Sequence, residues 1–218
     1  MFPALVIFDC DGVLVDSETP ANEVLVANLA RHGMALTIEE AEHKFVGGTL
    51  QTEFETLKAM GANLPDDWCM EYRKELHGRL REGVEPIAGV IAVLDLLDEK
   101  GVRYCVASNG SDEKMSITLG QTGLWERFDG RRFSARTIGI AKPEPGLYLA
   151  AAEAMGVTAD QCVVIEDSAS GALAAQRAGM LCFGYAPKGT GQALAAHGAR
   201  IFRDMSQLPE LLNQHGAG

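Results

Sequence analysis

Long apolar runs and basic residues are both scarce in this chain of 218 residues. No segment approaches the roughly 20 consecutive apolar residues that a membrane-spanning helix needs, and the opening residues lack the basic leader of a signal peptide. Only 19 Lys and Arg stand against 30 Asp and Glu, which gives a net charge of -11. Such a chain lacks the basic surface that neutralises nucleic-acid phosphates. We therefore expect a cytoplasmic protein with neither a membrane nor a nucleic-acid partner.

Cysteines are few, odd in number and without C-x-x-C spacing, and the five histidines are dispersed. This pattern argues against a disulfide framework and against a zinc site. Cys105, Cys162 and Cys182 lie within apolar runs, where a free cysteine behaves as a small core residue. Cys10, which lies between two aspartates, is expected to point into the core as well. Reduced thiols of this kind fit a reducing compartment.

Short, continuous apolar runs recur along the chain, at residues 4–8, 102–107, 162–165, 181–185 and 200–202. Continuous rather than alternating runs are typical of strands that are covered on both faces, as in a parallel sheet. Helical patterns that end at Gly101, Gly156 and Gly179 separate the later runs, as glycine commonly follows a helix. The sequence therefore predicts an α/β fold with a doubly wound parallel sheet.

Residues 17–84 interrupt this alternation of strands and helices, because they contain helical patterns and no convincing strand. Thr37 and Glu40 have the spacing of a capping box, and Asp16 and Ser17 are placed to cap the first helix of the segment. We therefore predict a core domain of residues 1–16 and 85–218 with a four-helix domain, residues 17–84, inserted into it.

Polar residues follow the predicted strands, where ligands bind in an open α/β sheet. They are Asp9 and Asp11 after the first run, Ser108 and Asn109 after the second, Glu166 and Asp167 after the third, and Lys142 in a loop before a helix. Because the carboxyl ends of parallel strands meet at one edge of the sheet, these side chains are expected to converge there.

The chemistry of this set indicates phosphoryl transfer. Asp9 and Asp167 can hold Mg²⁺, which prefers oxygen ligands. Ser108, the amide groups around Asn109 and Lys142 can bind phosphate oxygens. Asp9 can then attack phosphorus, and Asp11 can protonate the leaving oxygen and later activate water.

Each cluster alone also has an ordinary structural explanation. An Asp-x-Asp pair can form a turn or a structural calcium loop, and Ser108-Asn109-Gly110 can form a simple turn. Lys142 alone can be a solvated lysine, and Glu166 can cap the following helix. Together the clusters favour the chemical interpretation, with Asp167 as a metal ligand and Glu166 as its support or an alternate ligand.

Four segments, DCDGVLVDSE, ASNG, AKPEPG and VVIEDSASG, resemble in order and spacing the four motifs of the haloacid dehalogenase superfamily. The resemblance implies a Rossmann-like core with an inserted helical cap, the nucleophile Asp9 and the acid/base Asp11. It implies Mg²⁺ on the Asp9 carboxylate, the Asp11 backbone carbonyl and Asp167, with Glu166 nearby. Phosphate would be bound by Ser108 and Lys142.

Within the superfamily the motifs resemble most the 6-phosphogluconate phosphatase branch and, less closely, the beta-phosphoglucomutases. Members that act on haloacids lack an acid at the position of Asp11. The segment FVGGTLQT, residues 45–52, contains no Lys or Arg for a second phosphate, and Lys44 lies just outside it. We therefore predict a Mg²⁺-dependent phosphatase of small phosphorylated metabolites, sugar or sugar-acid phosphates. A phosphomutase-type transferase and a catalytically silent binding protein remain alternatives.

Overall fold

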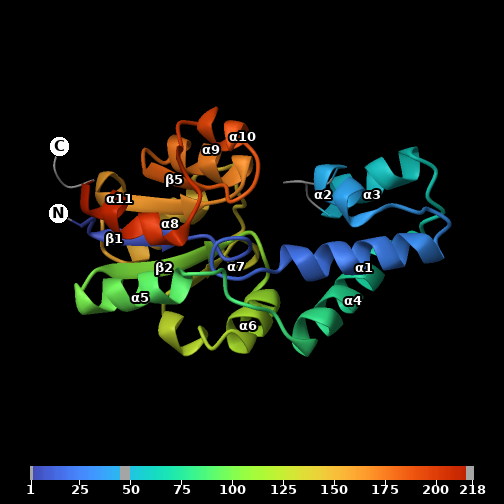
Figure 1. Ribbon diagram of the computed structural model, residues 1–218, viewed down its shortest axis with the longest axis horizontal. Helices are drawn as coiled ribbons and strands as arrows, with labels where there is room; N and C mark the ends of the chain where they lie inside the picture. The colour runs from blue at the N-terminus through green and yellow to red at the C-terminus, as the bar shows by residue number, and fades with distance from the viewer. Residues whose placement is uncertain (1, 45–49, 215–218) are drawn as a thin grey trace. The chain divides into compact units, whose positions relative to one another are not determined.

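The computed structural model describes residues 2–44 and 50–214, and the chain divides into two compact units (Figure 1). One unit consists of Met1–Val15 and Glu85–Gly218, and the other of Asp16–Val84. The first unit contains the sheet and the second is helical. A role for Asp16–Val84 as a cap over the site stays a prediction.

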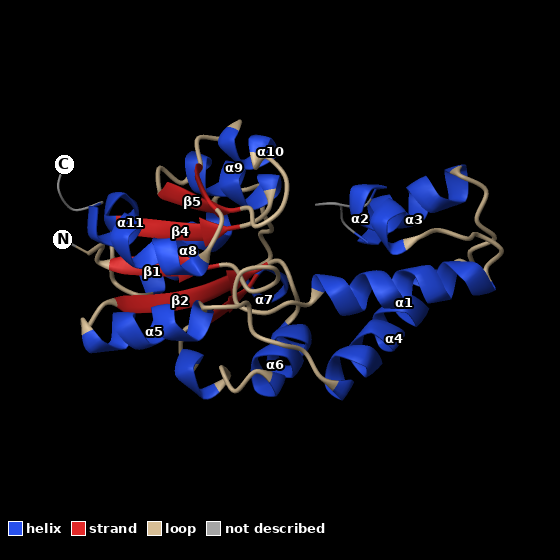
Figure 2. Cartoon of the chain, in the orientation of Figure 1, coloured by secondary structure: helices blue, strands red, loops and turns tan. Residues whose placement is uncertain are grey.

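A parallel six-stranded sheet forms the centre of the first unit (Figure 2). Its strands are β1 (Leu5–Phe8), β2 (Arg103–Ser108), β3 (Arg132–Ser134), β4 (Cys162–Glu166), β5 (Leu181–Tyr185) and β6 (Arg200–Phe202). Their order is β3-β2-β1-β4-β5-β6, and every neighbouring pair is parallel. This is the order of a doubly wound fold, so the predicted fold class is confirmed.

Helices cover both faces of this sheet, which explains the continuous apolar strands. All four residues of β1 are fully buried. Alternate residues of the central strands, such as Leu5 and Ile7, pack in one apolar cluster with residues of α8 (Gly146–Ala154) and α9 (Ala169–Arg177). On the other face α5 (Val90–Glu99) packs against β2, where the Tyr104 hydroxyl donates a hydrogen bond of 2.9 Å to Asp98.

The remaining helices and turns complete the unit. They are α6 (Asp112–Gln121), α7 (Ala135–Ile138), α10 (Gln192–Ala195), α11 (Leu208–Gln214) and the 3-10 turns η1 (Glu126–Phe128), η2 (Ala159–Gln161) and η3 (Met205–Gln207).

The short edge strand β3 was not predicted from the sequence. It has three residues, Arg-Phe-Ser, and pairs with β2 from Val106 opposite Arg132 to Ser108 opposite Ser134. Phe133 is its only large apolar residue and stands between Arg132 and Ser134, so no continuous apolar run reveals this strand. Its Arg132 guanidinium lies over the Trp125 ring, 3.6 Å from the ring centroid.

The strand order reverses between β1 and β4, which makes the carboxyl ends of these two strands the expected ligand crevice. Phe8 pairs with Ile165 of β4 and with Val106 of β2. Asp9 therefore follows β1 directly beside the end of β4, where Glu166 and Asp167 lie.

The helical unit contains α1 (Glu18–Arg31), α2 (Ile38–Lys44), α3 (Leu50–Ala59) and α4 (Trp68–Glu82), and its described residues include no strand. The predicted capping box is present, because the Thr37 N–H donates to Glu40 at 2.8 Å and the Glu40 N–H donates to Thr37 Oγ1 at 3.1 Å. At the start of α1 the Thr19 N–H donates to Asp16 Oδ1 at 3.3 Å.

A buried amide joins α1 to α4 inside this unit. Asn28 is fully buried, and its Oδ1 accepts a hydrogen bond of 2.6 Å from Trp68 Nε1. Its Nδ2 donates to Glu71 and Glu75, each at 3.2 Å. The Trp68 ring stacks on Tyr72 with a centroid distance of 5.3 Å, and both aromatic residues belong to the buried core of the unit.

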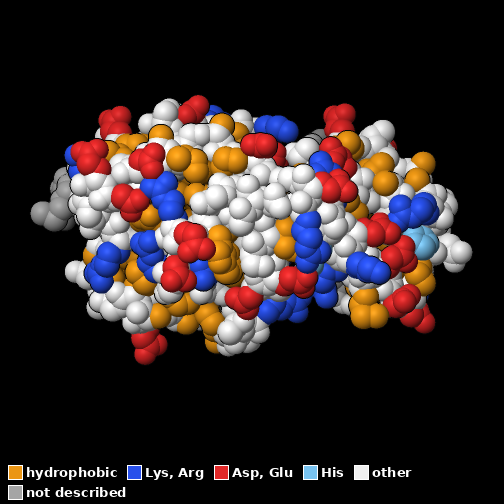
Figure 3. All heavy atoms as spheres, turned by 90° about the horizontal axis from the view of Figure 1, so that it is seen from below, with side chains coloured by type: hydrophobic (Ala, Val, Ile, Leu, Met, Phe, Trp, Pro, Cys, Tyr) orange, Lys and Arg blue, Asp and Glu red, His pale blue; other side chains and the backbone are white. Residues whose placement is uncertain are grey.

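Two sequence predictions fall on parts of the chain that are not described. Residues 45–49 of the segment FVGGTLQT, which lacks a cation for a second phosphate, lie outside the described residues, as does the side-chain environment of Lys44. No helix in ranges 2–44 and 50–214 is both long and apolar enough to cross a bilayer. Acidic and basic side chains are interspersed on the face drawn in Figure 3.

Candidate active site

Asp9 begins the site at the end of the central strand. Its backbone N–H donates a hydrogen bond of 2.9 Å to the Ile165 carbonyl of β4, which continues the sheet pairing by one residue. The Asp9 side chain is buried and forms an ion pair with Lys142. Burial raises the pKa of the Asp9 carboxyl to about 7; the Lys142 ammonium opposes this rise, and the nearby Glu166 carboxylate adds to it.

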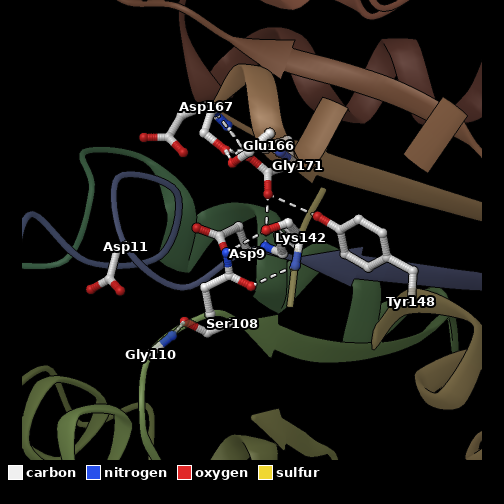
Figure 4. A network of polar contacts seen from close by, with 12 residues as sticks. Asp9, Asp11, Ser108, Gly110, Lys142, Tyr148, Glu166, Asp167 and Gly171 are labelled. Atoms are coloured by element: carbon white, nitrogen blue, oxygen red, sulfur yellow. Dashed lines mark hydrogen bonds and ion pairs between the residues drawn. The ribbon is translucent and has the colours of Figure 1, made fainter. Parts of the chain in front are cut away.

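Lys142 places a buried ammonium group between two carboxylates (Figure 4). It bonds to Asp9 and, at 2.7 Å, to Glu166 Oε1, and it lies 5.0 Å from the centroid of the Tyr148 ring. Burial lowers the pKa of this ammonium, but the two carboxylates outweigh that effect and raise it above its ordinary value. Lys142 is therefore a fixed positive charge beside Asp9.

The backbone of Lys142 is held from the neighbouring loop. Asn109 Oδ1 accepts from the Lys142 N–H at 2.9 Å, and Asn109 Nδ2 donates to the Lys142 carbonyl at 3.2 Å. Arg177 of α9 donates to the Pro143 carbonyl at 3.0 Å. The Asn109 side chain thus orients Lys142, and the predicted phosphate contact of Asn109 would fall to its backbone N–H.

Glu166 ends β4 and is fully buried, with five donors on its two oxygens. Oε1 accepts from Lys142 and from the Tyr148 hydroxyl at 2.8 Å. Oε2 accepts from the N–H groups of Asp167 and Ser168 and from the Ser168 hydroxyl. Burial raises the pKa of Glu166, but Lys142 and these hydrogen bonds outweigh it and hold the pKa below its usual range.

Gly171 makes room for this carboxylate. A Cβ atom on Gly171 would lie 1.7 Å from Glu166 Oε1, far inside van der Waals contact. The first turn of α9 therefore approaches Glu166 closely, and Ser168 caps that helix by accepting from the Gly171 N–H at 3.1 Å. Glu166 thus links the lysine, the following loop and the start of α9.

Three carboxylates meet where a metal ion can bind. Oxygen atoms of Asp9, Glu166 and Asp167, one from each, lie within 4.8 Å of one another. Asp167 points past Gly12, where a Cβ would lie 1.9 Å from its Oδ2 and where φ is +77°. An all-oxygen donor set of this kind fits Mg²⁺, so the residues present suit the predicted ion.

The two remaining predicted residues border this cluster. Ser108 ends β2, is buried, and its Oγ accepts from the Gly110 N–H at 2.9 Å. Asp11 carries a more exposed carboxylate, and its Oδ1 lies 2.8 Å from Lys114 Nζ. Figure 4 shows Asp11 apart from the Lys142–Glu166 contacts. Cys10 between the acids is fully buried, with Sγ 3.8 Å from Thr118 Oγ1, as expected for a core thiol.

The structure also adds residues that the sequence did not indicate. Tyr148 lies on α8. The sequence could have indicated it, because it is a tyrosine in a largely apolar helix and a buried tyrosine hydroxyl needs a hydrogen-bond partner. Lys114 lies in the first turn of α6. The sequence feature that could have indicated it is a lysine three residues after Ser111, the N-cap of this helix. Gly12 and Gly171, which leave room for the carboxylates of Asp167 and Glu166, lie within the segments DCDGVLVDSE and VVIEDSASG, but no role was predicted for either glycine.

Known proteins resemble this chain along most of its length. A family model described as haloacid dehalogenase-like hydrolase matches residues 3–179. The 6-phosphogluconate phosphatase of Escherichia coli (strain K12) is 32% identical over 213 residues, which cover 97% of this chain and 95% of that protein. Hexitol phosphatase A of the same organism is 32% identical over 178 residues, covering 79% and 78% of the two chains.

A solved structure gives the same fold. The crystal structure of a HAD family hydrolase from Deinococcus radiodurans R1, with bound phosphate and sodium, matches with a TM-score of 0.84. It is 29% identical to this chain, and the match covers 98% of this chain and 96% of that one.

Proposed function

This chain belongs to the haloacid dehalogenase-like hydrolase family and is a phosphoric monoester hydrolase, and we propose that it is a Mg²⁺-dependent phosphatase of sugar and sugar-acid phosphates with Asp9 as its nucleophile. The observation that carries the proposal is the position of Asp9. This buried carboxylate ends the central strand between the Lys142 ammonium and the oxygens of Glu166 and Asp167.

The substrate class is supported by the relatives. Both Escherichia coli proteins are phosphatases of polyhydroxylated carbon chains by name, a sugar acid in one and a hexitol in the other. The local positive charge of Lys142 suits a phosphate dianion, which a chain with a net charge of -11 would otherwise repel.

The proposed reaction has two steps on the same carboxylate. An Asp9 oxygen attacks phosphorus, the bond to the substrate oxygen breaks, and Asp11 gives that oxygen a proton. Asp11, now a carboxylate, then takes a proton from water as the water attacks phosphorus, which frees Asp9 and inorganic phosphate. Ser108 and Lys142 bind the phosphate oxygens throughout and hold them toward Asp9.

Metal ligands in this proposal are Asp9, Asp167 and the Asp11 backbone carbonyl. The bound Mg²⁺ supplies positive charge that offsets the negative charge of the phosphoryl oxygens. Glu166, whose oxygens already accept five hydrogen bonds, orients Lys142 and the Asp167 loop. In this proposal Asp167 binds the metal ion, and Glu166 holds the Asp167 loop in place without binding the ion itself.

Replacement of the nucleophile tests the reaction. Asp9→Asn should lower kcat for 6-phosphogluconate and for 4-nitrophenyl phosphate more than about a hundredfold, at least ~2.7 kcal/mol in the barrier, because an amide does not attack phosphorus. Thermal melting and circular dichroism should report an intact fold. Lys100→Ala is the matched control, since Lys100 forms an exposed ion pair with its neighbour Glu99. A smaller loss in Asp9→Asn would reject the assignment.

Metal titration tests the ligand set. Asp167→Asn should raise the Mg²⁺ concentration for half-maximal activity by about tenfold or more, and Glu166→Gln should raise it less. Ca²⁺ should inhibit, because its larger and looser coordination sphere misplaces the nucleophile. The reverse order of the two variants would make Glu166 the ligand, and full activity in excess EDTA would reject the metal.

A further inference from the structure

Asp11 is held by a cation that none of the four motifs contains. Its Oδ1 lies 2.8 Å from Lys114 Nζ, and the two side chains are 26% and 21% exposed. This pair is separate from the buried Lys142 ion pairs with Asp9 and Glu166. The candidate acid/base residue therefore has an ammonium partner of its own at the edge of the site.

The start of α6 aims Lys114 at Asp11. Ser111 caps the helix by accepting from the Lys114 N–H at 3.2 Å. The preceding loop is fixed because the Ser134 hydroxyl donates to the Gly110 carbonyl at 2.8 Å. A Cβ on Gly110 would lie 3.6 Å from both Asp11 Oδ2 and Lys114 Cδ. The side chains of Asp11 and Lys114 therefore both pack against the backbone of Gly110.

We propose that Lys114 is a positioning residue, which holds the Asp11 carboxylate in the orientation that proton transfer requires; the inference rests on the proposed acid/base role of Asp11. A proton is transferred only when donor and acceptor lie about 2.6–3.2 Å apart. A partly exposed aspartate rotates freely about its side-chain bonds unless a partner holds it. The ammonium, which only donates, holds Oδ1 and directs Oδ2 to the transferred proton.

Lys114 and the phosphate-binding Lys142 differ in the carboxylate with which each forms an ion pair. Lys142 contacts the nucleophile and is buried, whereas the ion pair of Lys114 is with Asp11. Loss of Lys114 should therefore slow the steps that move a proton and leave the attack on phosphorus intact when the leaving group needs no proton. A plain surface ion pair would contribute only about 0–1 kcal/mol to stability and nothing to the reaction.

Stopped-flow hydrolysis of 4-nitrophenyl phosphate, a substrate with a good leaving group, separates these steps. Lys114→Met should preserve the burst of 4-nitrophenol and lower the steady-state rate about ten- to a hundredfold, because water activation needs a correctly held Asp11. KM should fall by a similar factor, so that kcat/KM, which reports the intact attack on phosphorus, stays within about twofold. Lys114→Arg should recover part of the rate, and Lys100→Ala should match the unsubstituted chain.

A double-mutant cycle decides whether Lys114 acts through Asp11. Lys114→Met should cause no further loss in an Asp11→Asn background, because the group it positions is already disabled. Additive losses, a raised KM with unchanged kcat, or a burst reduced in proportion to the steady-state rate would each overturn the proposal. If Lys114→Met fails to fold, Lys114→Gln enters the same cycle. An Asp11→Asn variant with full activity would instead reject the acid/base role itself, and the proposed function with it.

Discussion

Glu53, in the first turn of α3, carries a carboxyl group that burial perturbs. Burial raises its pKa from 4.5 to about 7. The folded chain therefore binds this proton more tightly than the unfolded chain. Stability from the protonated form is fully present below the unfolded pKa and is lost as the pH rises through the folded pKa near 7.

Glu53→Gln should accordingly raise the melting temperature at pH 8 and leave it unchanged near pH 4, because a neutral amide avoids the partly buried charge. The expected gain follows the usual relation of roughly 2–4 °C per kcal/mol for a chain of this size. Thermal melting at the two pH values measures it. Glu55→Gln, at an exposed position of the same helix, should show no such pH-dependent gain, and equal behaviour of the two variants would contradict the prediction.

Residues at the ends of apolar strands were predictable, and residues on helices were not. Asp9, Ser108 and Asp167 end or directly follow buried strands, and in a parallel sheet the strand order alone brings such positions together. Tyr148 and Lys114 reach the site from helices, where the direction of a side chain depends on how the helix packs. The detailed role of Asn109 likewise depends on the path of the Lys142 loop, which no local pattern specifies.

The turn from β4 into α9 depends on the absence of a side chain at Gly171. Gly171→Ala would drive a Cβ into Glu166 Oε1, at 1.7 Å, and so displace the group that holds Lys142. We expect a loss of about 3 kcal/mol in the free energy of unfolding and a fall of about tenfold or more in kcat/KM. Urea denaturation and steady-state kinetics measure the two effects.

Gly120→Ala is the matched control for this variant. Gly120 lies in α6 of the same unit, and a Cβ there would meet no atom within 4 Å. Alanine should stabilise that helix by up to about 1 kcal/mol and leave kcat/KM unchanged. If the two alanine variants behave alike, the close approach of α9 to Glu166 has no energetic importance.

The pairing of α1 with α4 depends on the buried amide of Asn28. Asn28→Leu would leave Trp68 Nε1 without its acceptor and would remove one donor from each of Glu71 and Glu75, at a cost of about 2–4 kcal/mol. Arg31→Ala removes an ion pair with Glu75 in which the arginine is 51% exposed, and should cost less than about 1 kcal/mol. Urea denaturation followed by circular dichroism compares the two, and equal losses would contradict the prediction.

Elements with a strong pattern were predicted well. The five apolar runs and the helical segment appear in the structure, whereas β3 escaped prediction because its residues carry no apolar run. Element bounds moved by a residue or so, since the end of a strand depends on pairing with its neighbours.

For the molecule as a whole, the proposed phospho-Asp9 intermediate has two possible acceptors, water and a second sugar hydroxyl, which give different products. A mutase must hold a second phosphate with a further cation, and the segment FVGGTLQT supplies none. Incubation with Mg²⁺, a hexose 1-phosphate and catalytic hexose bisphosphate should therefore release inorganic phosphate without accumulating the 6-phosphate isomer. Coupled assays of phosphate and isomer measure both products, and isomerisation much faster than phosphate release would establish transfer instead.

Asn109 and Gly110 form an Asn-Gly pair, the sequence most prone to spontaneous deamidation, in which the glycine N–H attacks the asparagine amide. In the folded chain that N–H is bonded to Ser108 Oγ at 2.9 Å, and the amide is bonded on both sides to Lys142. Folding therefore protects the pair chemically, and each unfolding event exposes it. An aspartate formed there would turn a carboxylate toward the Lys142 carbonyl. We therefore expect deamidation at this pair to be slow in the folded chain and to accumulate irreversibly when heat unfolds it.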